Sequence, residues 1–212
     1  MSVPRRHMNA TILPDGTVLA TGGTSGGGFD DVSLANAALN AEVWDPKAGP
    51  AGQWTTLAKA ADIPRVYHSV SMLLPDGTVL HGASGNAMIN NNGNKTPAPD
   101  QRSHQIFSPP YLFKGARPVI TSAPGTVGYG QTFSVATPNG AQVTDVRWIR
   151  LGAVTHAFDQ SARANTLTFT RTATGVDVTA PVKPELAPPG PYLLFLLNRN
   201  GVPSKGQFIT IQ

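Results

Sequence analysis

Histidines and tyrosines are the side chains of this sequence best suited to chemistry. The histidines stand at positions 7, 68, 81, 104 and 156, and the tyrosines at positions 67, 111, 129 and 192. No two histidines follow an HxH or HxxxH spacing, so a metal site would have to be assembled by the fold. Neighbours on a regular strand point to opposite faces, so Tyr67 and His68 could bind one ion only where the backbone is irregular. Pro64, just upstream, favours a loop or a strand start there.

Each of these residues also has a purely structural interpretation. Tyr67 could be a strand tyrosine with a hydrogen-bonded hydroxyl at the edge of the core, and His68 a hydrogen-bonded histidine at the end of a strand. His156 lies between two expected strands, where an exposed loop histidine is the common outcome. His7 could be a further ligand by its repeat position, or simply a hydrogen-bonded histidine. Residue types and spacing leave both interpretations open.

Other reaction classes find little support in the sequence. It has no GxSxG nucleophile elbow, and its glycine runs lack the GK[ST] ending and the following helix of a phosphate-binding loop. Asp15 and Asp76 follow proline in turn sequences, where a carboxylate accepts local backbone N–H bonds. The chain has no cysteine, which removes disulfides, thiolate ligands and cysteine nucleophiles.

Composition favours a turn-rich β protein. Among 212 residues there are 22 glycines and 19 prolines, and charged residues make up 13%, against about 25% in a typical globular domain. The net charge of +4 comes from scattered basic residues, so we expect no nucleic-acid partner. No run of eighteen apolar residues occurs, and the N-terminal residues lack the apolar segment of a signal peptide. We therefore expect neither a membrane span nor an export signal in this chain.

An internal repeat organises the first half. The sequence LPDGTVL occurs at residues 13–19 and again at 74–80, which aligns Arg6 and His7 with Tyr67 and His68. Each copy predicts a strand, a Pro-Asp-Gly turn, a second strand, a glycine-rich loop and an outer strand. Units of this kind are typical of β-propeller blades, and two blades cannot close a ring. Residues 33–43, the nearest candidate for a helix, are too short to change the prediction of an all-β fold.

The second half has the strand spacing of an immunoglobulin-like sandwich. Short strands are expected at residues 132–136, 145–151, 166–170, 192–198 and 207–211. The sequence thus predicts an incomplete kelch-type β-propeller of about two blades over residues 1–111, followed by a β-sandwich over residues 112–212.

The run Pro64–Leu80, PRVYHSVSMLLPDGTVL, resembles the segment of galactose oxidase and glyoxal oxidase that gives a copper ion its axial tyrosine and one histidine. The resemblance continues through residues 105–112, 154–157, 189–195 and 201–204, and it identifies the sandwich as an early-set domain. It implies that Tyr67 is the axial ligand and catalytic base, and that His68 and His156 are equatorial ligands. Two imidazoles, a phenolate and open oxygen positions suit tetragonal Cu(II).

The resemblance also implies an activity. Such copper radical oxidases convert primary alcohols or aldehydes with O₂ and release hydrogen peroxide, usually outside the cell. A second tyrosine, crosslinked to cysteine, holds the radical in the family. Because this chain has no cysteine, the Tyr-Cys radical cofactor is not encoded in it, and we expect the chain alone to be inactive.

Two further expectations concern partners and the rival class of function. The outer face of the first blade should be covered by the missing propeller blades or by self-association, since blades are stabilised by their neighbours. The alternative function is a non-catalytic extracellular module of propeller blades and early-set domain that binds carbohydrate or protein.

Overall fold

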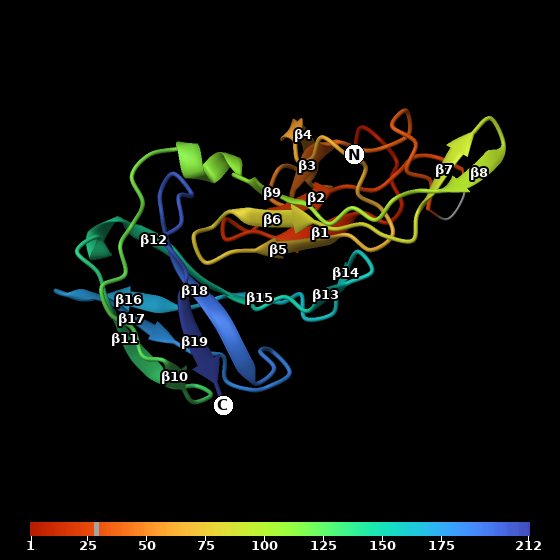
Figure 1. Cartoon of the computed structure of the whole chain (residues 1–212). Helices are drawn as coiled ribbons and strands as arrows, with labels where there is room; N and C mark the ends of the chain where they lie inside the picture. The colour runs from red at the N-terminus through yellow and green to blue at the C-terminus, as the bar shows by residue number, and fades with distance from the viewer. Residues whose placement is uncertain (28–29) are drawn as a thin grey trace. The chain divides into compact units, whose positions relative to one another are not determined.

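The computed structural model describes residues 1–27 and 30–212, and their regular structure is almost entirely β (Figure 1). The expected all-β class is confirmed, because helical structure in the described residues is limited to two short 3-10 turns, η1 (Pro110–Phe113) and η2 (Gly140–Gln142). No helix in this part of the chain is both long and apolar enough to cross a membrane.

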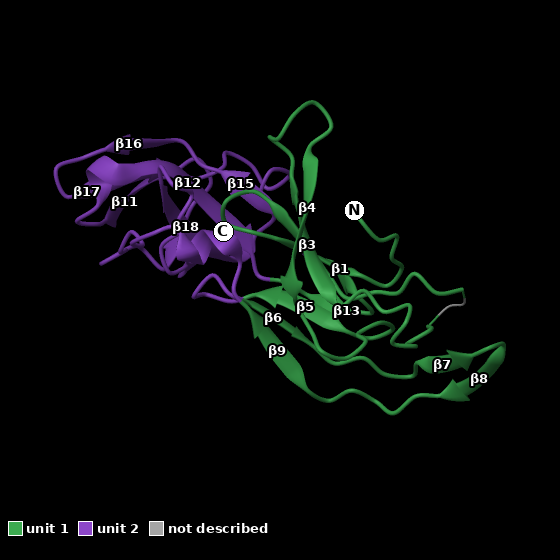
Figure 2. Cartoon of the chain, turned by 90° about the horizontal axis from the view of Figure 1, so that it is seen from above, with its two compact units in different colours: residues 1–73, 79–107, 152–160 green, residues 74–78, 108–151, 161–212 purple. Residues whose placement is uncertain are grey.

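Residue contacts divide the chain into two compact units, shown in green and purple in Figure 2. Unit 1 comprises residues 1–73, 79–107 and 152–160, and unit 2 comprises residues 74–78, 108–151 and 161–212. Neither unit is continuous in sequence. His156 therefore belongs to unit 1, together with Tyr67 and His68, although the neighbouring segments of the chain belong to unit 2.

The first sheet of unit 1 is a four-stranded antiparallel meander in the order β1-β2-β3-β4. Its strands are β1 (Asn9–Ile12), β2 (Val18–Thr21), β3 (Asn40–Asp45) and β4 (Gln53–Lys59). The turn between β1 and β2 needs glycine, since Gly16 has a φ of +87°. Asp15 accepts hydrogen bonds from the backbone N–H and the hydroxyl of Thr17, at 3.1 and 2.6 Å. The aspartate of the repeat is therefore structural, as its turn position predicts.

The second sheet of unit 1 repeats this order with one strand fewer. It runs β5 (Val70–Leu73), β6 (Val79–Gly82) and β9 (His104–Phe107), all antiparallel. Between β6 and β9 the chain makes a separate hairpin of β7 (Met88–Asn91) and β8 (Asn94–Pro97). The edge of β9 that faces away from β6 has no strand partner within the described residues.

The two sheets pack face to face through a ladder of buried polar side chains. Its hydrogen bonds join Asn9 to Ser69 at 2.9 Å, Thr11 to Ser71 at 2.9 Å, and Thr21 to His81 at 3.3 Å. Partners are 60 residues apart, whereas the repeat, which begins at Leu13 and at Leu74, has an offset of 61. Residues at equivalent positions of the repeat point to the same face of their respective sheets. Two stacked sheets, however, contact each other through opposite faces. Since side chains alternate along a strand, each residue must meet the neighbour of its equivalent.

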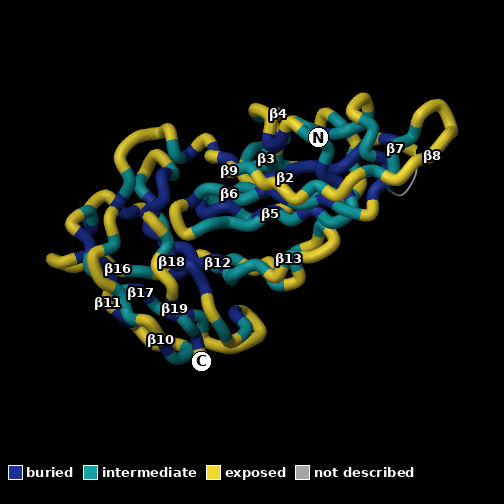
Figure 3. Tube along the Cα trace, viewed as in Figure 1, coloured by how far each residue is buried: buried dark blue, intermediate teal, exposed yellow. Residues whose placement is uncertain are grey.

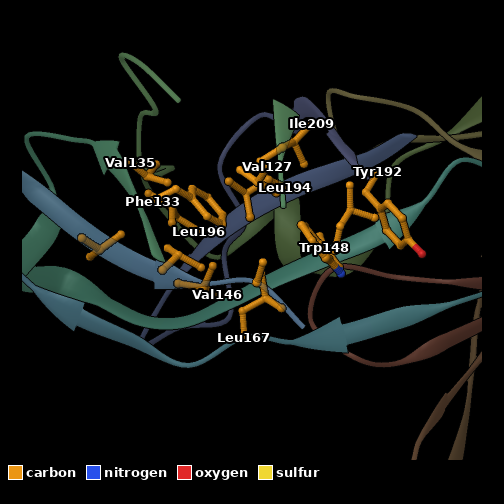
Figure 4. Close-up of a cluster of buried hydrophobic side chains, with 14 of the residues drawn as sticks. Val127, Phe133, Val135, Val146, Trp148, Leu167, Tyr192, Leu194, Leu196 and Ile209 are labelled. Carbon is orange, nitrogen blue, oxygen red and sulfur yellow. The ribbon is translucent and has the colours of Figure 1, made fainter. Parts of the chain in front are cut away.

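Unit 2 is a sandwich of a five-stranded and a three-stranded sheet. The larger runs β10 (Thr126–Val127), β19 (Gln207–Ile211), β18 (Gly190–Asn198), β12 (Val143–Arg150) and β15 (Ala164–Thr166). The smaller runs β11 (Thr132–Ala136), β17 (Gly175–Thr179) and β16 (Phe169–Arg171). Figure 4 shows the apolar cluster between them, and Figure 3 shows how deeply β18 is buried.

One strand prediction in unit 2 is wrong. The strand expected at residues 166–170 is split between β15, which ends at Thr166, and β16, which begins at Phe169 and belongs to the other sheet. The side chain of Leu167 is buried in the core at the point where the chain changes sheets, and its N–H donates to the carbonyl of Val146 at 2.8 Å. A run of alternating residues cannot reveal such a crossing, because both short strands keep the period of two.

Candidate functional site

A tight hairpin carries His156. Its strands are β13 (Val154–Thr155) and β14 (Phe158–Asp159), and the two loop residues His156 and Ala157 have φ values of +55° and +60°. Favoured two-residue hairpin loops have positive φ values at both residues, and such values strain residues other than glycine. The hairpin packs against β1 and β5, and Ala157 donates its N–H to the carbonyl of Ser69 at 3.2 Å. His156 is thereby held beside the start of β5.

The segment before β5 has the irregular backbone that a shared site at Tyr67 and His68 requires. His68 has a φ of +142°, and its N–H donates to the carbonyl of Val66 at 2.7 Å. As a result the two neighbouring rings lie on one side, with centroids 3.8 Å apart and planes inclined by 36°. On a regular strand these side chains would point to opposite faces.

The rings of the three candidate ligands converge. The His68 and His156 centroids are 4.5 Å apart at 73°, and those of Tyr67 and His156 are 5.6 Å apart at 65°. His7, which has a left-handed φ of +57°, places its ring 5.7 Å from that of Tyr67, edge to face. Two histidines are not part of this cluster: His81 is buried between the sheets, and His104 is exposed on β9.

Both candidate imidazoles use Nδ1 for a hydrogen bond within the protein. His68 Nδ1 lies 3.1 Å from the Gly85 carbonyl, and since a carbonyl only accepts, this nitrogen carries the proton. His156 Nδ1 lies 2.7 Å from the Thr155 hydroxyl. This leaves Nε2 of each ring as the nitrogen that can bind a metal. The described residues contain no group of three or more His, Cys, Asp or Glu side chains that could hold a metal, so a metal bound at this cluster would also need the Tyr67 phenol.

The short loop Ala83–Gly85 holds the segment that carries Tyr67 and His68 through hydrogen bonds. Ser84 Oγ accepts the Val66 N–H at 3.0 Å and donates to the Tyr67 carbonyl at 3.3 Å. Gly85 also donates its N–H to that carbonyl at 2.8 Å. Sequence reasoning missed this loop and the buried Arg65 that contacts it. The small residues after β6 signal a turn, but nothing in the spacing of Arg65 distinguishes it from a surface arginine.

Two protein families match the chain in succession. The model of the glyoxal oxidase N-terminus matches residues 1–111, and that of the galactose oxidase-like early set domain matches residues 117–211. An aldehyde oxidase of Arabidopsis thaliana is 33% identical over the whole chain. A galactose oxidase of Gibberella zeae is 31% identical over 98% of it.

A solved structure agrees with these matches. A fungal alcohol oxidase of the AA5 family, in complex with copper, covers the whole chain with a TM-score of 0.84 and 28% identity. The chain spans 36% of the Arabidopsis relative, 29% of the Gibberella relative and 43% of the fungal structure. It therefore corresponds to less than half of each of these proteins.

Fold and site together define an all-β protein in which a tyrosine and histidines converge at the ends of two stacked sheets. The chain belongs to the galactose oxidase and glyoxal oxidase family, as its resemblance in sequence predicts.

Proposed function

We propose that this chain supplies three ligands, Tyr67, His68 and His156, to the single copper ion of a copper radical oxidase. The observation that carries the proposal is the convergence of these rings within unit 1, although His156 is 88 positions beyond His68 in the sequence. Two imidazole nitrogens and a phenolate oxygen are a suitable donor set for Cu(II), and both imidazoles present Nε2.

The chain's own residues would bind the metal and move a proton. Copper bound there would supply one-electron redox chemistry and polarise a substrate oxygen. The phenolate oxygen of Tyr67 would take the hydroxyl proton of a primary alcohol or an aldehyde hydrate, acting as general base. The Gly85 carbonyl and the Thr155 hydroxyl would keep the two imidazoles oriented. Overall, an alcohol and O₂ would give an aldehyde and hydrogen peroxide.

The radical partner would come from residues outside these 212. The chain contains no cysteine, so a tyrosine crosslinked to cysteine cannot form within it. We therefore propose that the chain does not turn over by itself, and that it acts outside the cell or at its surface as part of a larger oxidase. If it has no such partner, its function would be that of a non-catalytic module that binds carbohydrate or protein.

We further propose that residues 1–111 are two kelch-type propeller blades and residues 112–212 the early-set domain. Two features support missing blades. In β1, Ala10 is exposed and Ile12 half-buried on the face opposite the polar ladder, and β9 has an open edge in the described part of unit 1. Further blades, or a second copy of the chain, would cover these surfaces. A compact, well-behaved monomer in analytical ultracentrifugation of this chain would contradict this.

Copper titration followed by electron paramagnetic resonance tests the ligand set. We expect one copper per chain and a tetragonal, nitrogen-rich Cu(II) spectrum that is lost in His156→Ala. His104→Ala is the matched control, because His104 is an exposed histidine on β9 of the same unit. Absence of specific copper binding, or a spectrum unchanged in His156→Ala, would refute the copper site and favour the non-catalytic module.

A further inference from the structure

Arg65 is a buried cation with only neutral partners. The residue is 1% exposed, and its guanidinium donates to the Ala83 carbonyl at 2.8 Å, to Ser103 Oγ at 3.1 Å, and to Gln105 Oε1 at 2.7 and 3.2 Å. The ion pairs within residues 1–27 and 30–212 join Arg5 to Glu42 and Arg147 to Asp145, so none includes Arg65. Burial lowers the pKa of the Arg65 guanidinium. A buried charge without a counter-ion is costly, so a compensating role is expected.

The contacts of Arg65 lead directly to the candidate ligands. Its hydrogen bond to Ala83 fixes the start of a loop in which Ala83 and Ser84 have φ values of +58° and +146°, both unusual without glycine. The next residues of this loop reach back to the chain just after Arg65. Ser84 binds the backbone of Val66, and Gly85 binds the Tyr67 carbonyl and His68 Nδ1.

We infer that Arg65 is a positioning residue: by clamping the strained loop Ala83–Gly85 to β9, it sets the Nδ1-protonated tautomer and the orientation of the His68 ring. The part of this inference that concerns copper rests on the proposed function. The part that concerns the tautomer does not, because the Gly85 carbonyl accepts from His68 Nδ1 in the protein itself.

The geometry requires an arginine rather than any cation. The planar guanidinium donates on one side to a loop carbonyl and on the other to two side chains of the strand region 103–107. A lysine ammonium is a single point on a flexible stem and cannot span both sets of acceptors at once. Arg65→Lys therefore keeps the charge and removes the clamp.

The first test needs no metal. Nitrogen-15 NMR distinguishes the two tautomers of a neutral imidazole by the chemical shifts of Nδ1 and Nε2. We expect His68 to be protonated at Nδ1 in the wild-type chain and to become a mixture of tautomers in Arg65→Lys. Arg117→Lys is the matched control, since Arg117 also donates to three acceptors, the carbonyls of Pro203, Ser204 and Asp76 in unit 2.

The second test measures copper. The outer partner of His68 is the Gly85 carbonyl, and loss of such a partner typically weakens metal binding about tenfold or more. Because Arg65→Lys releases the loop that carries this carbonyl, it should weaken copper binding by up to about tenfold and alter the nitrogen hyperfine splitting. Arg117→Lys should match the wild type in both respects. If Arg65→Lys unfolds, Ser103→Ala removes one acceptor and should shift the tautomer in the same direction by less.

The outcomes separate the two proposals. The inference about Arg65 would be overturned if the His68 tautomer in Arg65→Lys were the same as in the control Arg117→Lys. If Arg65→Lys unfolds, the same comparison with Ser103→Ala decides. A wild-type chain that binds no copper, but whose tautomer responds to Arg65→Lys, would refute the proposed function and leave the positioning role intact.

Discussion

The interiors of the two units are built from different chemistry. Eleven buried polar or charged residues of the described chain lie in unit 1, among them the ladder residues, Arg65 and Glu42, whereas unit 2 has three. The core of unit 2 is instead an apolar cluster in which Trp148 stacks on Tyr192, with ring centroids 4.8 Å apart (Figure 4). Apolar packing is non-directional, whereas hydrogen bonds between buried groups are satisfied only at one relative position of the partners.

This difference relates to the position of the candidate site. The polar ladder begins at Ser69, the residue after His68, and fixes the register of β5 against β1. The same two strands contact the hairpin that carries His156. Part of the interior of unit 1 thus sets positions through hydrogen bonds, each of which adds little net stability, whereas the interior of unit 2 is stabilised mainly by apolar burial.

The largest effect is expected in the apolar core of unit 2. Leu194 is fully buried in the cluster, so Leu194→Ala should lower the free energy of unfolding by about 2–5 kcal/mol through lost burial and a residual cavity. Urea denaturation followed by circular dichroism measures this. Leu186→Ala, at a leucine that is 45% exposed in the same unit, should cost less than about 0.5 kcal/mol. Similar costs at the two leucines would mean that unit 2 does not depend on its apolar core.

The next effect is a pH dependence of unit 1 that arises from His81. Burial, and then the charge of Arg65, lower the pKa of His81 to about 4, against the opposing hydrogen bond to the Val70 carbonyl. His81 Nε2 is buried without a hydrogen-bond partner, so a second proton there would be unsatisfied. Thr21 and Val70 face its other nitrogen.

The sign of this dependence follows from proton linkage. The unfolded chain, with an ordinary histidine pKa near about 6.5, takes up the proton first as the pH falls. The contribution of His81 is therefore complete above that pH and is lost progressively down to about pH 4, amounting to roughly 3 kcal/mol. Urea titrations across this range should show a smaller pH slope in His81→Gln than in the wild type. The exposed-site control His104→Gln should keep the wild-type slope, and an unchanged slope in His81→Gln would contradict the prediction.

Local sequence chemistry predicted much of the fold. The Pro-Asp-Gly turns place the β1-β2 and β5-β6 hairpins, because Asp15 and Asp76 bind the backbone two residues onward. The change of sheet at Leu167 is set by the packing of distant strands, so it leaves no local signal. By contrast, the burial of β18 on both faces, which Figure 3 shows as a run of buried residues, has a local signal in the continuous apolar run Tyr192–Leu197.

The sequence was enough to select the residues of the candidate site, but not to predict how they converge in space. Motif resemblance selected Tyr67, His68 and His156. Their convergence depends on positive φ values at His68, His156 and Ala157. None of these positions holds a glycine or asparagine, the residues that would signal such a backbone conformation. Arg65 and the loop that it holds act through backbone carbonyls, whose positions depend on the complete fold.

The smallest effect tests the ladder itself. Thr11 and Ser71 share one hydrogen bond of 2.9 Å between the two sheets, and both side chains are buried. Thr11→Val and Ser71→Ala should each cost about 1–2 kcal/mol, because each leaves the other hydroxyl buried without its partner. The double variant leaves no orphan hydroxyl in this pair and should cost about as much as one single variant, giving a coupling energy of about 1 kcal/mol. Additive costs in this double-mutant cycle, measured by urea denaturation, would show that the two hydroxyls are independent. The polar interior of unit 1 would then stabilise the sheets residue by residue, as the apolar core of unit 2 does, rather than through pairs that specify their register.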